Sequence, residues 1–368
     1  MRDKPSRRIK FGLQKIATAA GVSIATVSRV LNGNNTVDPV IRDTVLAAAA
    51  ELEIDLSPRN KAKALAFLFS NRPMQHAFHS SILMGAEAYC AAHGWELIFQ
   101  STNYPPQVSG KELHLPTVVQ LHDIVRGVIL AGTNSANLID LLTVKKIPFV
   151  VLGNNVMGEV EHPNYDAVFS DDIQGGQDMV RHLISLGHRD IWFVGNTRLP
   201  WFARCYEGYR RAMDEAGLPT RLSAVDSEDE TDIGYLGTKS LLAKHEPVTA
   251  IFAGNDPTAH GVYKGLRDSG LDIPSDISVA GCDDTVGSWL YPSLTTIREF
   301  PEQLGKKMVE LLVNRIASPT MERQLMTLPT ELLKRNSCRP VTDSERSTAL
   351  SANPGGAGSR IPADPPGL

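Results

Sequence analysis

Apolar positions near the N-terminus recur at the spacing of short helices. Leu13, Ile16 and Ala20 stand at i, i+3 and i+7, which is one stripe of a helix. Gly21 then allows a tight turn, and Ser23 is placed to cap a second helix. The inward-facing positions of that second helix are Val27, Val30 and Leu31. The pattern predicts a helix–turn–helix.

The second helix leaves mainly short side chains on its outward face. These positions are Ile24, Ala25, Ser28, Arg29 and Asn32. A helix whose outer face carries short side chains and one Arg can lie in the major groove of DNA and reach the base edges. The segment therefore indicates a DNA-binding function.

A third helix is predicted over residues 39–52. Asp38 can cap this helix, and Pro39 suits its first turn. Its predicted inner stripe is Val40, Ile41, Val45, Leu46 and Ala49. Three short helices can share one small core, so residues 1–57 are interpreted as an all-α helix-turn-helix head, followed by a linker over residues 58–65.

Beyond the linker, short apolar runs alternate with helix-like stretches. The runs cover residues 66–69, 96–99, 127–130, 149–152, 191–194, 250–253 and 277–280. Such runs are typical of strands buried on both faces, and several of the stretches between them end in Gly, as helices often do. The alternation predicts a parallel, doubly wound α/β body over residues 66–335. Its length favours two parallel-sheet subdomains with a cleft between them.

Charge is divided unevenly along the chain. Residues 1–63 carry 11 Lys and Arg against 6 Asp and Glu, a net charge of +5, which leaves −9 for residues 64–368 because the total is −4. A basic head on an acidic body fits a module that meets phosphates. The last stretch, residues 336–368, is rich in Pro, Gly and Ser and is predicted to be disordered.

Several classes of protein are disfavoured. No run reaches the roughly 18 apolar residues that span a membrane, and the charged N-terminus lacks the apolar stretch of a secretory signal. Four cysteines lie far apart without metal-ligand spacing, so we interpret them as reduced thiols in a cytoplasm: Cys90, Cys205, Cys282 and Cys338. No cofactor is predicted.

The segment from Leu13 to Gly33, through SIATVSRVLNG, closely resembles the DNA-binding head of the lactose-repressor (LacI) family. The body resembles that family's effector-binding core in the stretches VFSDDIQGGQDMVRHLISLGHRDIWFVG, TAIFAGNDPTAHGVYKGLRDSGLDIPSDISVAGCDDT and YPSLTTIREFPEQLGKKMVELL. The resemblance runs from Phe11 to Arg335. It implies a periplasmic-binding-protein-like fold and a homodimer on a near-palindromic DNA operator. A sugar-like or nucleoside-like effector between the subdomains would control operator affinity, so the implied function is a transcriptional regulator, a repressor and not an enzyme.

Polar side chains follow two of the predicted strands, where ligands of open α/β sheets bind. Asn255 and Asp256 come after the sixth run, and Asp283 and Asp284 after the seventh. The resemblance implies that Asn255 and Asp283 contact the ligand. In the alternative interpretation for their neighbours, Asp256 and Asp284 cap the helix or turn that follows.

Further ligand contacts come from the resemblance. Many family members place an Arg where this chain has Cys205. Arg204 beside it, and Trp201, whose ring can stack on an apolar ligand face, are the candidates in its place, against surface or packing roles. Phe78 and His79 match the aromatic pair that opens the first helix of the body, and both are expected at the cleft.

The resemblance also assigns roles on the second helix, which begins at Ser23. It places Ile24 and Ala25 where base edges are read, and Arg29 on a base or phosphate. Arg prefers guanine through two hydrogen bonds, whereas Ile and Ala offer only apolar contact. The positions interpreted as phosphate contacts are Thr26, Ser28 and Asn32. Helix packing is the alternative for Thr26.

The linker departs from the family pattern. Lys61 and Lys63 are interpreted as contacts to the DNA backbone. Leu65 stands where the family has a Leu that wedges into the minor groove, yet a strand-like run follows at once. Leu65 is therefore either that wedge or the first residue of a buried strand.

Three other functions compete with this interpretation. An enzyme is disfavoured because no GxGxxG follows a strand and no GxxxxGK[ST] or GxSxG occurs. A transport-type binding protein would need export, and a DNA-binding regulator without a small ligand stays open. The histidine pairs 76 with 79 and 182 with 188 lack a further ligand, so no metal site is predicted.

Overall fold

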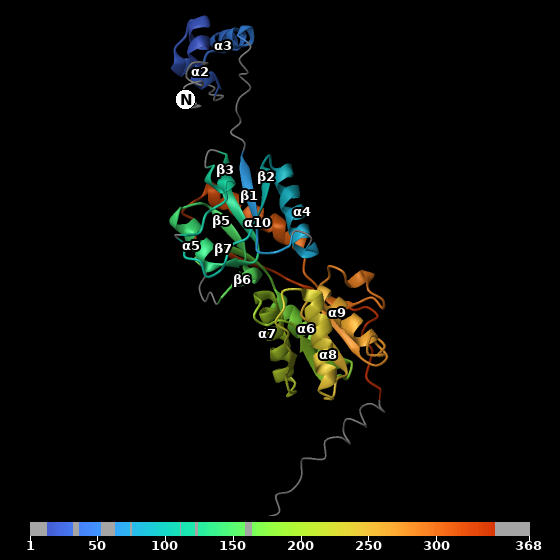
Figure 1. Ribbon diagram of the computed structural model, residues 1–368. Coiled ribbons are helices and arrows are strands. Elements are labelled where there is room, and N and C mark those ends of the chain that lie inside the picture. Colours follow the sequence, from blue (N-terminus) through green and yellow to red (C-terminus); the bar gives the residue numbers. More distant parts are fainter. Residues whose placement is uncertain are drawn as a thin grey trace, which may run out of the picture. The chain divides into compact units, whose positions relative to one another are not determined.

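The computed structural model describes residues 13–31, 37–52, 63–73, 76–110, 112–121, 124–158 and 164–342. The chain divides into two compact units, Met1–Ala64 with Leu121–Val125, and Leu65–Gln120 with Arg126–Leu368 (Figure 1). We call the helical segments within residues 13–52 of the first unit the head, and the part of the chain from Ala64 onward, which contains the second unit, the body. Within the described ranges, no helix combines the length and apolar character that crossing a membrane requires.

Three helical segments share the core of the head. They are residues 13–19, α2 (Ile24–Leu31) and α3 (Pro39–Glu51). Ile16, Val27 and Val45, one from each segment, are fully buried in one cluster. Gly21, between the first two segments, has a φ of +64°, a conformation that glycine adopts without steric cost. The predicted helix–turn–helix is confirmed.

The starts of both labelled helices agree with the predicted caps. The backbone N–H of Thr26 donates to Ser23 Oγ over 3.0 Å at α2. The backbone N–H of Val40 donates to Asp38 Oδ1 over 2.8 Å at α3. Each cap satisfies a donor that the first turn of a helix cannot use internally.

The predicted inner stripe of α3 is correct only in part. Val45 and Ala49 are buried together with Ala48. The exposed members of the predicted stripe are Val40, Ile41 and Leu46. Val40 and Leu46 lie about 140° and about 100° round the helix from Val45, so they face away from the core.

The body contains two six-stranded sheets, in the orders β13-β7-β5-β3-β1-β2 and β14-β12-β11-β10-β8-β9. The first sheet consists of β1 (Ala64–Ser70), β2 (Glu96–Thr102), β3 (Val125–Gly132), β5 (Phe149–Leu152), β7 (Asp166–Ser170) and β13 (Leu325–Leu328). The second consists of β8 (Ile191–Val194), β9 (Arg221–Ser223), β10 (Ala250–Ala253), β11 (Ser278–Asp283), β12 (Thr295–Arg298) and β14 (Glu331–Leu333). The short strands β4 (Asn134–Ser135) and β6 (Val156–Met157) pair separately. We call the parts built on the first and second sheets the first lobe and the second lobe.

The strand pairing confirms the predicted pair of parallel-sheet subdomains. In the second lobe, Ile251 of β10 lies opposite Trp192 of β8 and Val279 of β11, in parallel register. At the edge of this sheet, β14 runs antiparallel to β12. The run over residues 96–99 was predicted to be buried on both faces, but it belongs to the edge strand β2, whose side chains remain partly exposed.

Helices cover the sheets because alternate strand residues point to opposite faces. The helices are α4 (Ala77–Ala92), α5 (Ala136–Val144), α6 (Asp172–Ser185), α7 (Pro200–Glu215), α8 (Glu230–Ala243), α9 (Asp256–Arg267) and α10 (Pro301–Ala317). In β8, Phe193 packs with the buried residues of α6 and α7, whereas Trp192 packs with those of α8 and α9. In the first lobe, Ile82 of α4 and Met308 of α10 share one core.

The chain crosses between the lobes three times, after β7, after β12, and between β13 and β14 (Figure 1). The first crossing leads into α6, which begins at Asp172. The second carries Glu299 and leads into α10, which returns to the first lobe. The crossings therefore place two carboxylates at the junction of the lobes.

Two predicted boundaries need correction. Strand β1 begins at Ala64, so the linker predicted over residues 58–65 ends before that residue; residues 53–62 lie outside the described residues. Residues 336–342, predicted as part of a disordered tail, pack on the second lobe. The N–H of Val279 donates to the carbonyl of Ser337, and the N–H of Val341 to the carbonyl of Leu186, both over 2.9 Å. Residues 343–368 are also outside the description.

Candidate functional site

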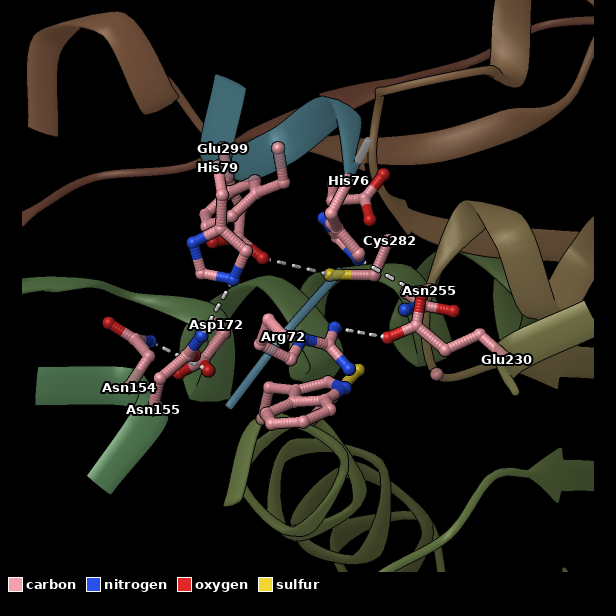
Figure 2. Close-up of a pocket in the computed structure, with 15 residues that line it drawn as sticks. Arg72, His76, His79, Asn154, Asn155, Asp172, Glu230, Asn255, Cys282 and Glu299 are labelled. Atoms are coloured by element: carbon pink, nitrogen blue, oxygen red, sulfur yellow. Dashed lines mark hydrogen bonds and ion pairs between the residues drawn. The ribbon is translucent and has the colours of Figure 1, made fainter. Parts of the chain in front are cut away.

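A pocket lies between the two lobes of the body (Figure 2). Arg72 follows β1 of the first lobe, whereas Asn255 and Asp283 stand at the ends of β10 and β11 of the second. Asp172 and Glu299 come from the crossings. The cavity among the lining side chains has a volume of about 30 Å³.

Close contact between α8 and α9 positions one wall of this pocket. A Cβ atom on Gly234 would collide with the backbone carbonyl of Thr258, and one on Gly261 with that of Thr231. The two glycines therefore let the starts of the helices approach side by side. Glu230, the first residue of α8, and Asn255, the cap of α9, both line the pocket from these starts.

Asn255 and Asp283 line the pocket, where the sequence placed them. Asn255 Oδ1 accepts the backbone N–H of Thr258 over 3.0 Å, so the residue caps α9 and its amide nitrogen is left to donate. Asp283 Oδ1 accepts the backbone N–H of Thr285 over 2.9 Å and its hydroxyl over 2.6 Å. The φ of Asp283 is 98°, a value that a residue with a side chain adopts only at a cost in energy. The turn that aims this carboxyl is therefore held under strain.

The alternative interpretation of Asp256 and Asp284 as caps is wrong. Asp256 accepts the hydroxyl of Thr296 over 2.6 Å and is fully buried. Asp284 accepts from Arg335 Nη2 over 2.6 Å and from Arg298 Nε over 2.9 Å. Both carboxylates tie together elements of the second lobe.

Asp283 and Glu299 form a buried acidic pair in the pocket. The thiol of Cys282 donates to Glu299 Oε1 over 3.5 Å. Burial raises the pKa of Asp283 well above its ordinary value, and the charges of Asp256 and Glu299 raise it further. Burial, with the charge of Asp172, raises the pKa of Glu299 to about 7. The pair therefore keeps protons at pH values at which exposed carboxyls have lost them.

A buried ion pair joins the two lobes across the pocket (Figure 2). Arg72 Nη2, from the first lobe, lies 2.7 Å from Glu230 Oε1 of the second, and His76 Nε2 lies 3.1 Å from Glu230 Oε2. The guanidinium of Arg72 stacks on the ring of Trp201, 4.3 Å from its centroid. Burial alone would raise the pKa of Glu230, but the hydrogen bond from His76 and the charge of Arg72 outweigh it and lower the pKa to about 2. We call these four residues the interlobe clamp.

Phe78 and His79 line the pocket from the first turn of α4, as expected. His79 is 3% exposed, and its Nε2 lies 3.2 Å from the amide nitrogen of Asn155. Because an amide nitrogen only donates, Nε2 accepts and the ring proton lies on Nδ1, which has no hydrogen-bond partner. Burial, then the charges of His76 and Arg72, lowers the pKa of His79 well below 6.5, so the ring is neutral.

The prediction that Arg204 lines the pocket needs a correction. Trp201 does line the pocket, as part of the clamp. Arg204 is not among the lining residues; its Nε and Nη2 lie 2.8 and 2.7 Å from Asp172 Oδ1. Asp172 faces the pocket instead, and Arg204 positions it. Cys205, where the resemblance expects an Arg, is 1% exposed and lines the pocket as a buried thiol.

The histidines near the pocket bind other side chains. His76 contacts Glu230, and His79 contacts Asn155. Across the part of the chain that the structure describes, no three His, Cys, Asp or Glu side chains are grouped so that they could hold a metal ion.

Sequence reasoning missed several lining residues. Arg72 follows the predicted run 66–69, so the rule applied to Asn255 would have found it. Asp172 and Glu299 follow β7 and β12, which were not among the predicted runs. Glu230 comes from the start of a helix, where no strand-end signal exists.

The outward face of α2 lies on the surface of the head. Its exposed residues include Ser23, Ile24, Ala25 and Arg29. Ser23 Oγ also lies 2.8 Å from the hydroxyl of Thr26, so both side chains take part in the cap. Thr26 and Ser28 are half-buried at the edge of this face. A row of short side chains beside one Arg can approach a groove closely.

The predicted wedge residue is wrong. Leu65 lies in β1, fully buried in the core of the first lobe with Phe67, so it cannot insert between base pairs. The alternative, a residue of a buried strand, is correct. Lys63 is exposed just before β1, whereas Asn32 and Lys61 lie outside the described residues.

Comparisons with known proteins match both parts of the chain. Residues 12–54 match the family described as bacterial regulatory proteins, lacI family, and residues 180–338 match a periplasmic binding protein-like domain. The ribose operon repressor of Haemophilus influenzae is 30% identical over 336 residues, covering 88% of this chain and 98% of its own. Catabolite control protein A of Priestia megaterium is 30% identical over 334 residues, with coverages of 88% and 98%. The solved complex of the transcriptional regulator CelR with cellobiose matches with a TM-score of 0.66 at 27% identity, covering 88% of this chain and 99% of that one.

Proposed function

The chain belongs to the lacI family of bacterial regulatory proteins, and from this premise we propose that it is a repressor controlled by a small ligand bound between the lobes of its body. It binds DNA as a homodimer, with each head placing α2 in the major groove of one half of a near-palindromic operator. The ligand changes how tightly the pair of heads binds. Because its relatives are regulators of transcription, we further propose that it catalyses no reaction and acts in the cytoplasm, beside the chromosome.

One observation carries the proposal: the same chain presents an exposed α2 and a pocket lined from both lobes. First-lobe residues Arg72 and His79 face second-lobe residues Asn255 and Asp283 across that pocket. A ligand that touches both walls binds differently to open and closed arrangements of the lobes. Only such a difference in affinity can shift an equilibrium between two states.

The chemistry of the lining supports a carbohydrate-like ligand. The amide of Asn255 and the ring N–H of His79 are buried donors, the carboxyl of Asp283 is an acceptor, and the ring of Trp201 offers an apolar face. Such a mixture suits a molecule whose hydroxyls donate and accept in turn. Two of the similar proteins are named for ribose or were solved with cellobiose, which agrees with this class.

The test is selection of bound DNA from a random pool by the full chain, with and without a mixture of sugars and nucleosides. We expect one enriched near-palindrome, and an affinity for it that the mixture changes. An unselective pool would refute the assignment as an operator-binding repressor. The variant Arg29→Ala is the control that separates base reading from general attraction to phosphates.

A second candidate is a DNA-binding regulator with no small ligand. The observation that favours it is the small cavity, about 30 Å³, whose two walls are joined by the interlobe clamp. A thermal-shift screen with sugars and nucleosides separates the two, because a ligand that binds only the folded state raises the apparent stability. No shift with any compound, together with selective DNA binding, would favour the second candidate.

A further inference from the structure

Most charged side chains in the pocket form ion pairs, but two carboxyls do not. Within the interlobe clamp, Arg72 pairs with Glu230, and outside it Arg204 pairs with Asp172. Asp283 and Glu299 accept hydrogen bonds from uncharged groups, and neither forms an ion pair with any residue in the described ranges. Both carboxyls are less than a tenth exposed and line the same cavity. The pocket therefore holds two buried acids that form no ion pair, and the charge that reaches Glu299 from Arg204 does not outweigh the effect of burial on its pKa.

A second observation points independently to a ligand. His79 is 3% exposed, and the Nδ1–H of its neutral ring has no acceptor. A buried donor without a partner is unfavourable, and an oxygen of a bound molecule would satisfy it. The Nε1–H of Trp201, on the opposite wall, also has no partner. The ligand therefore offers acceptor oxygens to these two rings.

The conformation of the acidic turn favours the same conclusion. Asp283 and Asp284 both have positive φ values, 98° and 56°. Two ion pairs, with Arg298 and Arg335, hold Asp284 in this conformation within the second lobe. The strain at Asp283 instead holds a carboxyl in the pocket beside a second acid. Strain of this kind persists where binding makes use of it.

We propose that the ligand is a polyhydroxy compound bearing a protonated amine, as an amino sugar does, and that Asp283 and Glu299 bind its ammonium group. This inference rests on the proposed function, since it names the class of ligand for the same pocket. An ammonium group has three N–H donors and can bind both carboxylates at once. Its positive charge takes the place of the protons that the acidic pair otherwise retains, and the ligand hydroxyls supply the oxygens for His79 and Trp201.

The test is isothermal titration of the full chain with glucose, galactose and mannose, each compared with its 2-amino-2-deoxy counterpart. For at least one pair of sugars, we expect the amine to bind about tenfold or more tightly than its neutral counterpart, because one charge-assisted hydrogen bond contributes at least that much affinity. In Glu299→Gln the ratio of amine to neutral affinity should fall toward one. Glu322→Gln, the same change at an exposed position outside the lining residues, should keep the wild-type ratio.

The pH dependence gives a second readout. The groups facing the acidic pair are Asp256, Asp172, Arg204 and the thiol of Cys282. Because an ammonium competes with protons on the pair, affinity for the amine should rise between about pH 5 and about pH 7, with release of protons to the buffer. A pH-independent affinity for the amine would overturn the inference.

The outcomes distinguish this inference from the proposed function. Equal or tighter binding of the neutral sugars would overturn the inference and leave a sugar-controlled repressor standing. If no compound of either kind binds, the amine inference fails, and the proposed ligand control fails for hexoses as well.

Discussion

Arg29 is the long basic side chain on the exposed face of α2, and its guanidinium can make two hydrogen bonds to one guanine. Its neighbours Ile24 and Ala25 can contact only apolar parts of the bases, such as the thymine methyl group. We therefore expect selectivity for a G·C pair to depend on one residue, and selectivity for A·T pairs on the fit of two small apolar side chains.

We predict that Arg29→Ala weakens operator binding by about 1–3 kcal/mol and relaxes preference at one base pair. Fluorescence anisotropy with the operator and its single-base variants measures both effects. Lys15→Ala, which removes one positive charge from another helix of the head, should weaken binding to all of these sequences alike. An Arg29→Ala variant that still discriminates every base pair as the wild type does would contradict the assignment.

Within the body, Glu299 makes the stability of the fold depend on pH. Its pKa is raised to about 7 in the folded chain, above the ordinary value of 4.5. The folded state then binds more protons than the unfolded state between these values. The stabilising contribution is present below the unfolded pKa and is lost as the pH rises through about 7.

Glu299→Gln removes this titration and keeps the shape of the side chain. Relative to the wild type, we predict that the variant gains on the order of 2 kcal/mol in free energy of unfolding as the pH rises from about 5 to about 8. Urea denaturation at a series of pH values measures the difference. Glu322→Gln should follow the wild-type curve; a Glu299→Gln curve parallel to the wild type would show that Glu299 does not titrate in this range.

Among the elements, the contact between the segment after β1 and the start of α8 joins the two lobes beside the pocket. Arg72 and Glu230, which are 8% and 7% exposed at their side chains, form this contact. Removing one partner of a buried ion pair costs about 3–5 kcal/mol, because the other charge stays buried without compensation. The lobes can avoid that cost by opening.

We predict that Arg72→Ala opens the cleft and increases amide hydrogen exchange at the start of α8. Mass spectrometry of the peptide that contains Glu230 and Ile233 reports the change. Arg198→Ala is the matched control, because the Arg198–Asp226 pair is close, at 2.6 Å, but 76% and 72% exposed. Exposed ion pairs contribute little to stability, so hydrogen exchange at the start of α8 should be the same in Arg198→Ala as in the wild type. Equal exchange in wild type and Arg72→Ala would mean that the clamp does not hold the lobes.

Elements could be predicted from sequence where one periodicity dominates. The helix–turn–helix and most strands follow directly from apolar spacing, because core burial selects that spacing. The inner stripe of α3 failed at Val40 and Leu46, since a helix rich in Ala has no strong preference for one face. The sequence did not decide whether Leu65 is a minor-groove wedge or a residue of a buried strand, because a hinge and the start of a strand have similar sequences over a few residues.

The pocket could be predicted only in part. Asn255 and Asp283 were found because they end strands that are easily recognised. Glu230 and Glu299 reach the pocket through a helix start and a crossing, which depend on how distant segments meet. The pairing of Arg204 with Asp172, rather than with a ligand, likewise depends on contacts between segments that local sequence does not encode.

In the whole molecule, the ligand pocket and the DNA-binding head are two sites on one chain that are coupled by a free energy. Ligand and operator bind to separate units, and each must change the affinity for the other by the same factor. Couplings of this kind are typically about 1–3 kcal/mol, or about 5- to 150-fold in affinity. Because a near-palindromic operator engages two heads, a change in the body that alters their spacing affects both half-sites together.

The most direct test is a titration of the selected operator with the full chain, at increasing concentrations of a ligand that binds the pocket, in wild type and in Asn255→Asp. That substitution keeps an oxygen to cap α9 and removes the amide donor that faces the pocket. The account predicts that the ligand shifts the dissociation constant of the wild type for its operator by at least about fivefold, and that Asn255→Asp needs much more ligand for the same shift. An operator affinity that stays constant while calorimetry shows the pocket to be saturated would contradict ligand control of DNA binding.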